Sequence, residues 1–169
     1  VMKQVLADRA FYVKSGGGIT LNGGEVAVQW RFAVEILKQC RVHHVNTCVE
    51  SSMQCSREVL KEFFPHTDLM ITDIQHMDDP VHRKYAGAGN ARILENIELT
   101  VEAGMPLIIR VPVIPGVNND EGNIMATSRF IAERLNNRVV QVQLLPYRKM
   151  GTEKYELLEK DYPMGDGYT

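Results

Sequence analysis

The chain has 169 residues, 44% of them hydrophobic, and its 19 basic and 21 acidic side chains leave a net charge of −2. We place one domain over residues 1–169, because the chain is shorter than the roughly 250 residues of a complete eight-unit barrel. Its charge gives no electrostatic footprint for nucleic acid. No apolar run reaches the roughly 20 residues that span a bilayer and no secretory signal is present, so we expect a cytoplasmic protein with no membrane partner.

Five short apolar runs rich in β-branched residues predict strands. The gaps between them are long enough to hold a helix each, which is typical of parallel strands. Runs such as LMITDI and LIIRVPVI are apolar almost throughout, as strands buried on both faces are. We therefore predict an α/β fold of parallel strands with outer helices. The predicted strands are 19–22, 45–49, 69–74, 107–114 and 139–145.

Helical periodicity appears in the gaps between these runs. The first predicted helix has an inner face of Val26, Trp30, Ala33, Leu37 and Cys40. A second helix, with apolar residues at 93, 94, 97 and 101, is predicted to begin after its N-cap Asn90 and to end at Gly104. A third follows Asn119–Asp120, and a short fourth lies around 57–64. The third has a predicted inner face of Ile124, Ser128, Ile131 and Leu135.

Polar residues follow nearly every predicted strand, and ligands of parallel α/β folds bind at this edge of the sheet. The candidate site residues are Gly23, Gly24, Glu25, Glu50, Ser51, Asp73, Gln75, Arg110 and Arg148. Carboxylates suit a ligand with an ammonium group, hydroxyls or a metal, whereas arginines suit a carboxylate. An amino-acid-like ligand satisfies both.

Each of these residues also has a purely structural interpretation. Gly23, Gly24 and Glu25 are equally typical of a turn followed by a helix cap. Arg110 could pair with Glu50 or Asp73 and only connect strands. The five histidines lack zinc-ligand spacing, so we interpret them as structural or solvated. The cysteines, at positions 40, 48 and 55, are interpreted as free thiols.

At YVKSGGGITLNGGE, residues 12–25, the chain resembles the radical S-adenosylmethionine enzymes that activate glycyl radical enzymes, most closely the pyruvate formate-lyase activating enzymes. The resemblance continues in order through DLMITDIQHMDDPVH, GNARILEN, IIRVPVIPGVN and LLPYRKMGTEKY, over nearly all of 8–156. It implies a partial TIM-like barrel that lacks its first βα unit. That unit carries CxxxCxxC, which binds a 4Fe-4S cluster, and we expect it upstream of Val1 in a longer chain.

The resemblance also implies roles for the site residues. Gly23, Gly24 and Glu25 would receive the amino group of S-adenosylmethionine. Glu50 and Ser51 would form an acid–hydroxyl pair near the ligand and a possible monovalent cation. Asp73 and Gln75 stand where the family has Asp-x-Lys, and Arg110 matches an arginine that faces cofactor or substrate peptide. Arg148 replaces a histidine, and we hypothesise that it compensates for the charge that Gln75 lacks.

The implied activity is reductive cleavage of S-adenosylmethionine to a 5′-deoxyadenosyl radical, which abstracts hydrogen from a glycine of a partner such as pyruvate formate-lyase. The electron donor would be flavodoxin or ferredoxin. Without cluster ligands, this fragment alone is expected to be inactive. One alternative is a degenerate barrel that docks a partner without radical chemistry. Another is an unrelated barrel enzyme that binds an amino-acid-like ligand.

The missing unit predicts an unpaired edge on the first strand of the chain. Ile19 and Leu21 or their neighbours should then border an apolar patch. We expect residues 1–12 to fold back over this edge, or the chain to associate with itself there.

Overall fold

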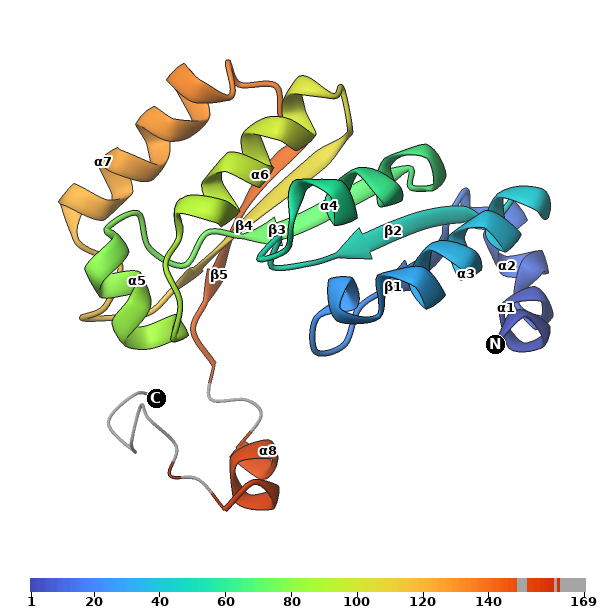
Figure 1. Cartoon of the computed structure of the whole chain (residues 1–169), viewed down its shortest axis with the longest axis horizontal. Coiled ribbons are helices and arrows are strands. Elements are labelled where there is room, and N and C mark those ends of the chain that lie inside the picture. The colour runs from blue at the N-terminus through green and yellow to red at the C-terminus, as the bar shows by residue number, and fades with distance from the viewer. Residues whose placement is uncertain (149–151, 160, 162–169) are drawn as a thin grey trace.

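The computed structural model describes residues 1–148, 152–159 and 161, and in them five strands form one sheet (Figure 1). Each strand pairs in parallel with the next strand in the chain, from β1 at one edge to β5 at the other. The predicted parallel α/β fold is confirmed, with every strand boundary within two residues of its predicted position. The strands are β1 Gly18–Leu21, β2 Asn46–Glu50, β3 Leu69–Asp73, β4 Leu107–Val113 and β5 Gln141–Pro146.

Helices occupy every gap between strands, and none in the described part of the chain is long and apolar enough to cross a membrane. Short 3-10 helices precede α3 and follow α4, and a π-helical turn follows α7; these are η1 Val26–Gln29, η2 Phe64–His66 and η3 Phe130–Arg134. The α-helices are α1 Met2–Ala7, α2 Arg9–Ser15, α3 Trp30–Val42, α4 Arg57–Phe63, α5 Asp79–Ala86, α6 Ala91–Glu102, α7 Glu121–Arg129 and α8 Thr152–Leu157.

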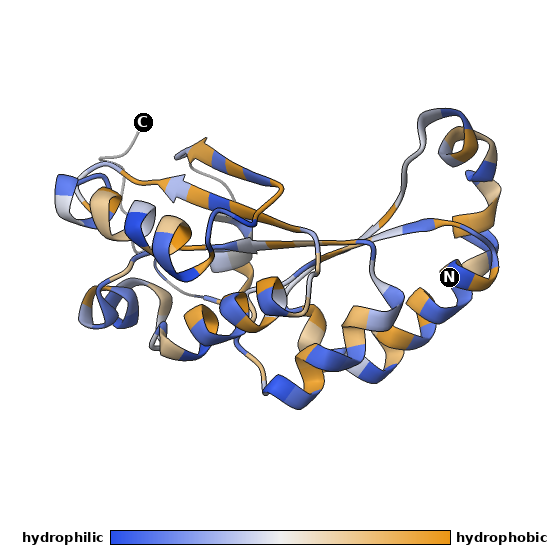
Figure 2. Cartoon of the chain, turned by 90° about the horizontal axis from the view of Figure 1, so that it is seen from above, coloured by the Kyte–Doolittle hydropathy of each residue, from blue (hydrophilic) through white to orange (hydrophobic). Residues whose placement is uncertain are grey.

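The main core lies between one face of the sheet and the helices that follow β1 to β4 (Figure 2). Val49, Met70 and Ile109 point into it from successive strands and are fully buried. Leu37 of α3 and Ile97 of α6 pack against them. The opposite face of the central strands bears the charged side chains of Glu50, Asp73 and Arg110, which are therefore available to a site.

The predicted inner face of helix α7 is wrong in its first half. Ile124 is 54% exposed and Ser128 is also exposed, whereas Asn123 and Thr127 are buried. The physical reason is the amide of Asn123, which accepts a hydrogen bond from the backbone N–H of Met77 and donates to the carbonyl of Asn118, turning this face inward. The π-helical turn then shifts the register, and the predicted inner residues Ile131 and Leu135 are buried.

Helix α6 begins and ends where predicted, but its N-cap works differently. Asn90 occupies the N-cap position without capping, and its amide donates instead to the carbonyls of His76 and Met77. Gly104 follows the helix with φ of +73°, which glycine adopts without strain. A predicted capping side chain thus connects α6 to the loop after β3.

Strand β1 is an edge strand among the described residues, because it pairs only with β2. Its close approach to β2 requires glycine at position 18, where a Cβ atom would lie 1.8 Å from the carbonyl oxygen of Asn46. The N-terminal helices fold back beside this strand, and residues such as Val5 and Leu6 pack with Ile36. The predicted open edge is confirmed among the described residues. Residues of α1 and α2 pack beside the strand, against α3, and whether they cover the edge itself stays a prediction.

An apolar cleft borders the same edge, as predicted for Leu21. It has a volume of about 400 Å³ and is lined by Leu21, Ile36 and two residues that remain largely exposed, Val28 at 78% and Phe32 at 58%. Water-exposed apolar side chains grouped in this way are typical of a surface that a further protein segment covers.

Candidate functional site

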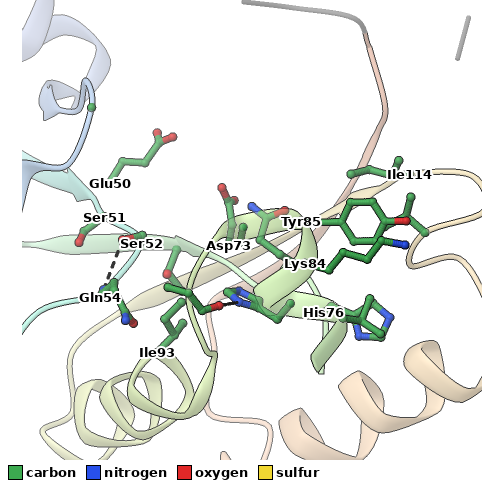
Figure 3. A pocket seen from close by; sticks show the side chains of 18 of the residues that line it. Glu50, Ser51, Ser52, Gln54, Asp73, His76, Lys84, Tyr85, Ile93 and Ile114 are labelled. Atoms are coloured by element: carbon green, nitrogen blue, oxygen red, sulfur yellow. Dashed lines mark hydrogen bonds between the residues drawn. The ribbon is translucent and has the colours of Figure 1, made fainter. Parts of the chain in front are cut away.

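A cavity of about 830 Å³ opens at the carboxyl ends of the strands, between the loops that follow β1, β2 and β3 and helix α5 (Figure 3). Its volume is in the range of small-molecule sites, roughly 300–1,000 Å³. Arg148 is exposed and does not line it, and neither do Glu25 and Arg110, which lie on the elements around it. The candidate residues that line the cavity are Gly23, Gly24, Glu50, Ser51, Asp73 and Gln75.

The two glycines leave the turn after β1 open to a ligand. Gly23 has φ of +140°, a conformation that L side chains rarely adopt. No atom lies within 4 Å of the position that a Cβ would take at Gly23 or Gly24. A ligand can therefore approach this backbone closely.

Glu25 lies beneath that turn and braces it. Its carboxylate accepts hydrogen bonds from the N–H of Ala27 at 2.9 Å, from Ser51 Oγ at 2.7 Å, and from both the N–H and the hydroxyl of Ser52. Burial alone would raise the pKa of Glu25, but the bonds from Ser52, Ala27 and Ser51 outweigh it and hold the pKa below its usual value. Glu25 is thus an ionised anchor that caps η1 and joins the loops after β1 and β2.

Glu50, Asp73 and Arg110 share the open face of the sheet on three successive strands. Arg110 Nη1 lies 3.0 Å from Glu50 Oε2, and Arg110 Nε donates to Gln143 Oε1 at 3.2 Å. Burial raises the pKa of Asp73, the charge of Glu50 raises it further, and Arg110 opposes the rise. Arg110 therefore forms the ion pair with Glu50 that its structural interpretation predicts. The carboxylates of Glu50 and Asp73 also line the cavity.

Buried asparagines hold the loops around the cavity, and they are not among the residues predicted from the sequence. Asn96 Nδ2 donates to the carbonyls of Met53 and Cys55, fixing the loop after β2. Asn118 Nδ2 donates to the carbonyl of Gln75 in the loop after β3. The signal was present, because these asparagines belong to GNARILEN and IIRVPVIPGVN, motifs used only as evidence of resemblance.

Helix α5 supplies a second wall that was not predicted, since only a few apolar residues in it are periodic. Its end signals were readable: Asp78 caps it, Pro80 stands in its first turn and Gly87 ends it. Lys84 lies over the ring of Tyr85, 4.9 Å from its centroid. Figure 3 shows these two side chains across the cavity from Glu50 and Ser51. The remaining unpredicted polar lining residues include Ser52, Gln54, Thr72, His76 and His82.

The cysteines do not form a cluster site. Cys40 lies on α3, Cys48 on β2 and Cys55 in the loop after β2, and all three are free thiols. Burial raises the pKa of each, that of Cys55 to about 11. Among the described residues no group of three histidine, cysteine or acidic side chains could hold a metal ion. These donors do not fit an iron–sulfur cluster, which is bound by several thiolates together.

The fold and the cavity define an α/β protein of partial-barrel type whose site lies at the carboxyl edge of a parallel sheet. Residues 4–127 match the family model of the radical SAM superfamily, where SAM is S-adenosylmethionine, and the chain belongs to that superfamily. A solved domain of the pyruvate-formate lyase-activating enzyme from Bacteroides vulgatus is similar, with a TM-score of 0.74 and 32% identity over 84% of this chain and 89% of that one.

Two curated relatives are 40% identical to the chain. The (2S)-3-sulfopropanediol dehydratase activating enzyme of Klebsiella oxytoca matches over 96% of this chain and 51% of its own length. The isethionate sulfite-lyase activating enzyme of Desulfovibrio desulfuricans matches over 98% and 53%. The chain spans about half the length of these relatives. Its relatives are activating enzymes of glycyl radical enzymes, which confirms the family resemblance.

Proposed function

We propose that this chain is the S-adenosylmethionine-binding barrel part of an enzyme that activates a glycyl radical enzyme. The observation that carries the proposal is the cavity, which places the carboxylates of Glu50 and Asp73 and the open backbone of Gly23 and Gly24 together. The two carboxylates and the free glycine backbone suit the ammonium group of an amino-acid-like ligand.

In this proposal the residues of the chain bind and orient the cofactor. Gly23 and Gly24 receive its amino group, Glu50 and Asp73 supply negative charge beside it, and Gln75 donates a hydrogen bond. Ser51 lines the site but gives its hydroxyl proton to Glu25, so it holds the loop after β2 in place. Glu25 acts through the turn that it braces. S-adenosylmethionine, once bound, supplies the carbon radical that removes hydrogen from a glycine of the partner. Since Cys40, Cys48 and Cys55 do not fit the cluster, we assign its ligands to other parts of a longer protein.

The partner is a glycyl radical enzyme, and pyruvate formate-lyase is one candidate because of the similar solved domain. The names of the curated relatives favour an enzyme that acts on a sulfonate as a second candidate. Flavodoxin or ferredoxin would supply the electron, in the cytoplasm. The alternative is a degenerate barrel that only docks its partner, and the experiments below distinguish it from an activating enzyme.

Calorimetric titration of the chain with S-adenosylmethionine tests the proposal. Glu50→Gln and Asp73→Asn should each weaken binding by about tenfold, because each removes a charged contact. Glu58→Gln, on the exposed side of α4, is the matched control and should bind as the parent chain does. A chain that does not bind S-adenosylmethionine, or variants that all bind equally, would overturn the proposal.

Activity requires the longer protein. There, a glycyl radical on the partner, detected by electron paramagnetic resonance, separates activation from mere docking. Arg148→Ala tests the compensation hypothesis: weaker cofactor binding supports it, and unchanged binding assigns the positive charge elsewhere. Arg148 is not among the described residues that line the cavity, so its guanidinium would have to act on the ligand from outside the cavity wall.

A further inference from the structure

Two buried histidines line the cavity from the side of α5. His76 lies in the loop after β3 and is 8% exposed, and His82 lies on α5 and is 4% exposed. Figure 3 shows His76 on the same side of the cavity as Lys84 and Tyr85, away from Glu50. The proposed cofactor contacts do not use either ring.

Each ring forms one hydrogen bond with the backbone through Nδ1. In His76 this nitrogen accepts, and in His82 it donates. The N–H of Asp78 donates to His76 Nδ1 at 3.0 Å, so this nitrogen carries a lone pair and the proton of the neutral ring is on Nε2. His82 Nδ1 lies 2.6 Å from the carbonyl oxygen of Ala88, which only accepts, so this nitrogen carries the proton and Nε2 has the lone pair.

The two Nε2 atoms remain for a ligand. No further hydrogen bond of either ring is formed to the residues that the structure describes. In the described part of the chain, the fully buried side-chain atoms that lack a hydrogen-bond partner are Thr72 Oγ1 and Asn96 Oδ1. The two Nε2 atoms are not among them, so both are accessible to solvent. The α5 side of the cavity therefore presents one fixed donor, on His76, and one fixed acceptor, on His82.

We propose that His76 and His82 bind the backbone of the polypeptide that enters the cavity, with His76 Nε2 donating to a peptide carbonyl and His82 Nε2 accepting from a peptide N–H. This inference rests on the proposed function, in which a glycine of a partner protein must reach the bound cofactor. A buried peptide unit needs both kinds of partner. A carboxylate would leave His82 unpaired, and an ammonium group would leave His76 unpaired.

The position of the pair supports a peptide over the cofactor itself. Glu50, one of the carboxylates that suit the cofactor's ammonium group, lies across the cavity from His76, and Asp73 lies between them. The α5 side is therefore the part that the proposed cofactor contacts use least. Val81, Tyr85 and Val117 border this side and give apolar surface to the segments that flank a glycine.

Asparagine substitutions test the pair because asparagine reproduces the Nδ1 position of histidine and lacks Nε2. In His76→Asn the side-chain oxygen still accepts from Asp78, and in His82→Asn the amide still donates to Ala88. His44→Asn is the matched control, since His44 is exposed and has a φ of +55° that asparagine tolerates. Long-range proton–nitrogen spectra at about pH 8 should show the Nε2–H form for His76 and the Nδ1–H form for His82.

The probe is blocked triglycine, N-acetyl-Gly-Gly-Gly-amide, titrated by nuclear magnetic resonance into the chain saturated with S-adenosylhomocysteine. We expect both cavity variants to weaken peptide binding by about three- to tenfold and the control to leave it unchanged. Binding of S-adenosylhomocysteine should be the same in all chains. Two rings in the same tautomer, or peptide binding unchanged in both variants, would overturn the inference. Loss of S-adenosylhomocysteine binding in the variants would assign the pair to the adenine edge and also overturn it, whereas failure of the parent chain to bind that compound contradicts the proposed function instead.

Discussion

Asn118 Nδ2 lies 2.9 Å from the carbonyl oxygen of Gln75 and so ties the loop after β4 to the loop after β3. The same amide donates to the carbonyl of Pro112, and its oxygen accepts from the N–H of Ile114 at 2.7 Å. One buried side chain thus satisfies backbone groups at the ends of two neighbouring strands. Since Gln75 lines the cavity, the shape of the site depends on this amide.

Replacing Asn118 by alanine should lower the free energy of unfolding by about 2–3 kcal/mol, because it leaves buried carbonyls and an N–H without partners. Urea unfolding measures the loss. Asn119→Ala is the control, because its oxygen accepts a single exposed bond from the N–H of Gly116. Equal losses in the two variants would contradict the bracing role of Asn118.

Glu25→Gln should destabilise the chain by about 2 kcal/mol at pH 7, since the amide that replaces one carboxylate oxygen cannot accept from Ser52 or Ala27. The effect should depend on pH in a definite direction. The pKa of Glu25 is lowered in the folded chain, so its charge stabilises the fold above its ordinary pKa of 4.5. This stabilisation is lost as the pH falls through the lowered pKa.

The measurement is a pair of urea midpoints for parent and variant at several pH values from 7 to about 3. The difference between parent and variant should shrink toward the acid end. Glu58→Gln, which removes an exposed carboxylate from the first turn of α4, controls for the general effect of charge. A difference that stays constant over this range would show that the ionised form of Glu25 does not brace the turn.

Arg110→Met should leave Glu50 and Asp73 as neighbouring carboxylates without their cation. The pKa of Asp73 is then expected to rise further, because the opposing charge of Arg110 is lost while burial and the neighbouring charge of Glu50 remain. We expect a stability loss of only about 1 kcal/mol, since the side chains are partly exposed and screened. Carbon-13 titration of the carboxyl groups checks the shift. Arg57→Met, which breaks an exposed pair with Glu95, should move neither carboxylate of the site.

The strands were predictable because their apolar runs are continuous, as in buried parallel strands. Once the strands were placed, Glu50 and Asp73 could be assigned to the ends of two of them. What the sequence could not show is which partner satisfies each polar group. Asn123 is polar, which is typical of a surface residue, yet it faces inward because its side-chain oxygen accepts from the N–H of Met77 in a distant loop. Likewise Glu25 follows a strand as a ligand residue would, but the neighbouring loop donates to its carboxylate.

The histidines illustrate the same limit. Their spacing excludes a zinc site by pattern, and from the sequence they were interpreted as structural or solvated. Only the fold brings His76 and His82 to one cavity and shows which nitrogen of each ring the backbone occupies. Directional hydrogen bonds between distant segments depend on tertiary placement, which hydrophobic periodicity does not encode.

The open edge of β1 leads to the last prediction, that the chain associates with itself through this side. Phe32 and Val28 are exposed beside Leu21, and within the part of the chain that the structure describes β1 pairs with a strand on one side only. Phe32→Ser should therefore reduce the average mass measured by light scattering at a given concentration. Phe11→Ser is the matched control, because Phe11 on α2 is even more exposed than Phe32 but does not line the cleft. A chain that is monomeric at all concentrations would mean that the helices α1 and α2 already cover the edge sufficiently, whereas an equal effect of both substitutions would point to general stickiness in place of a defined surface.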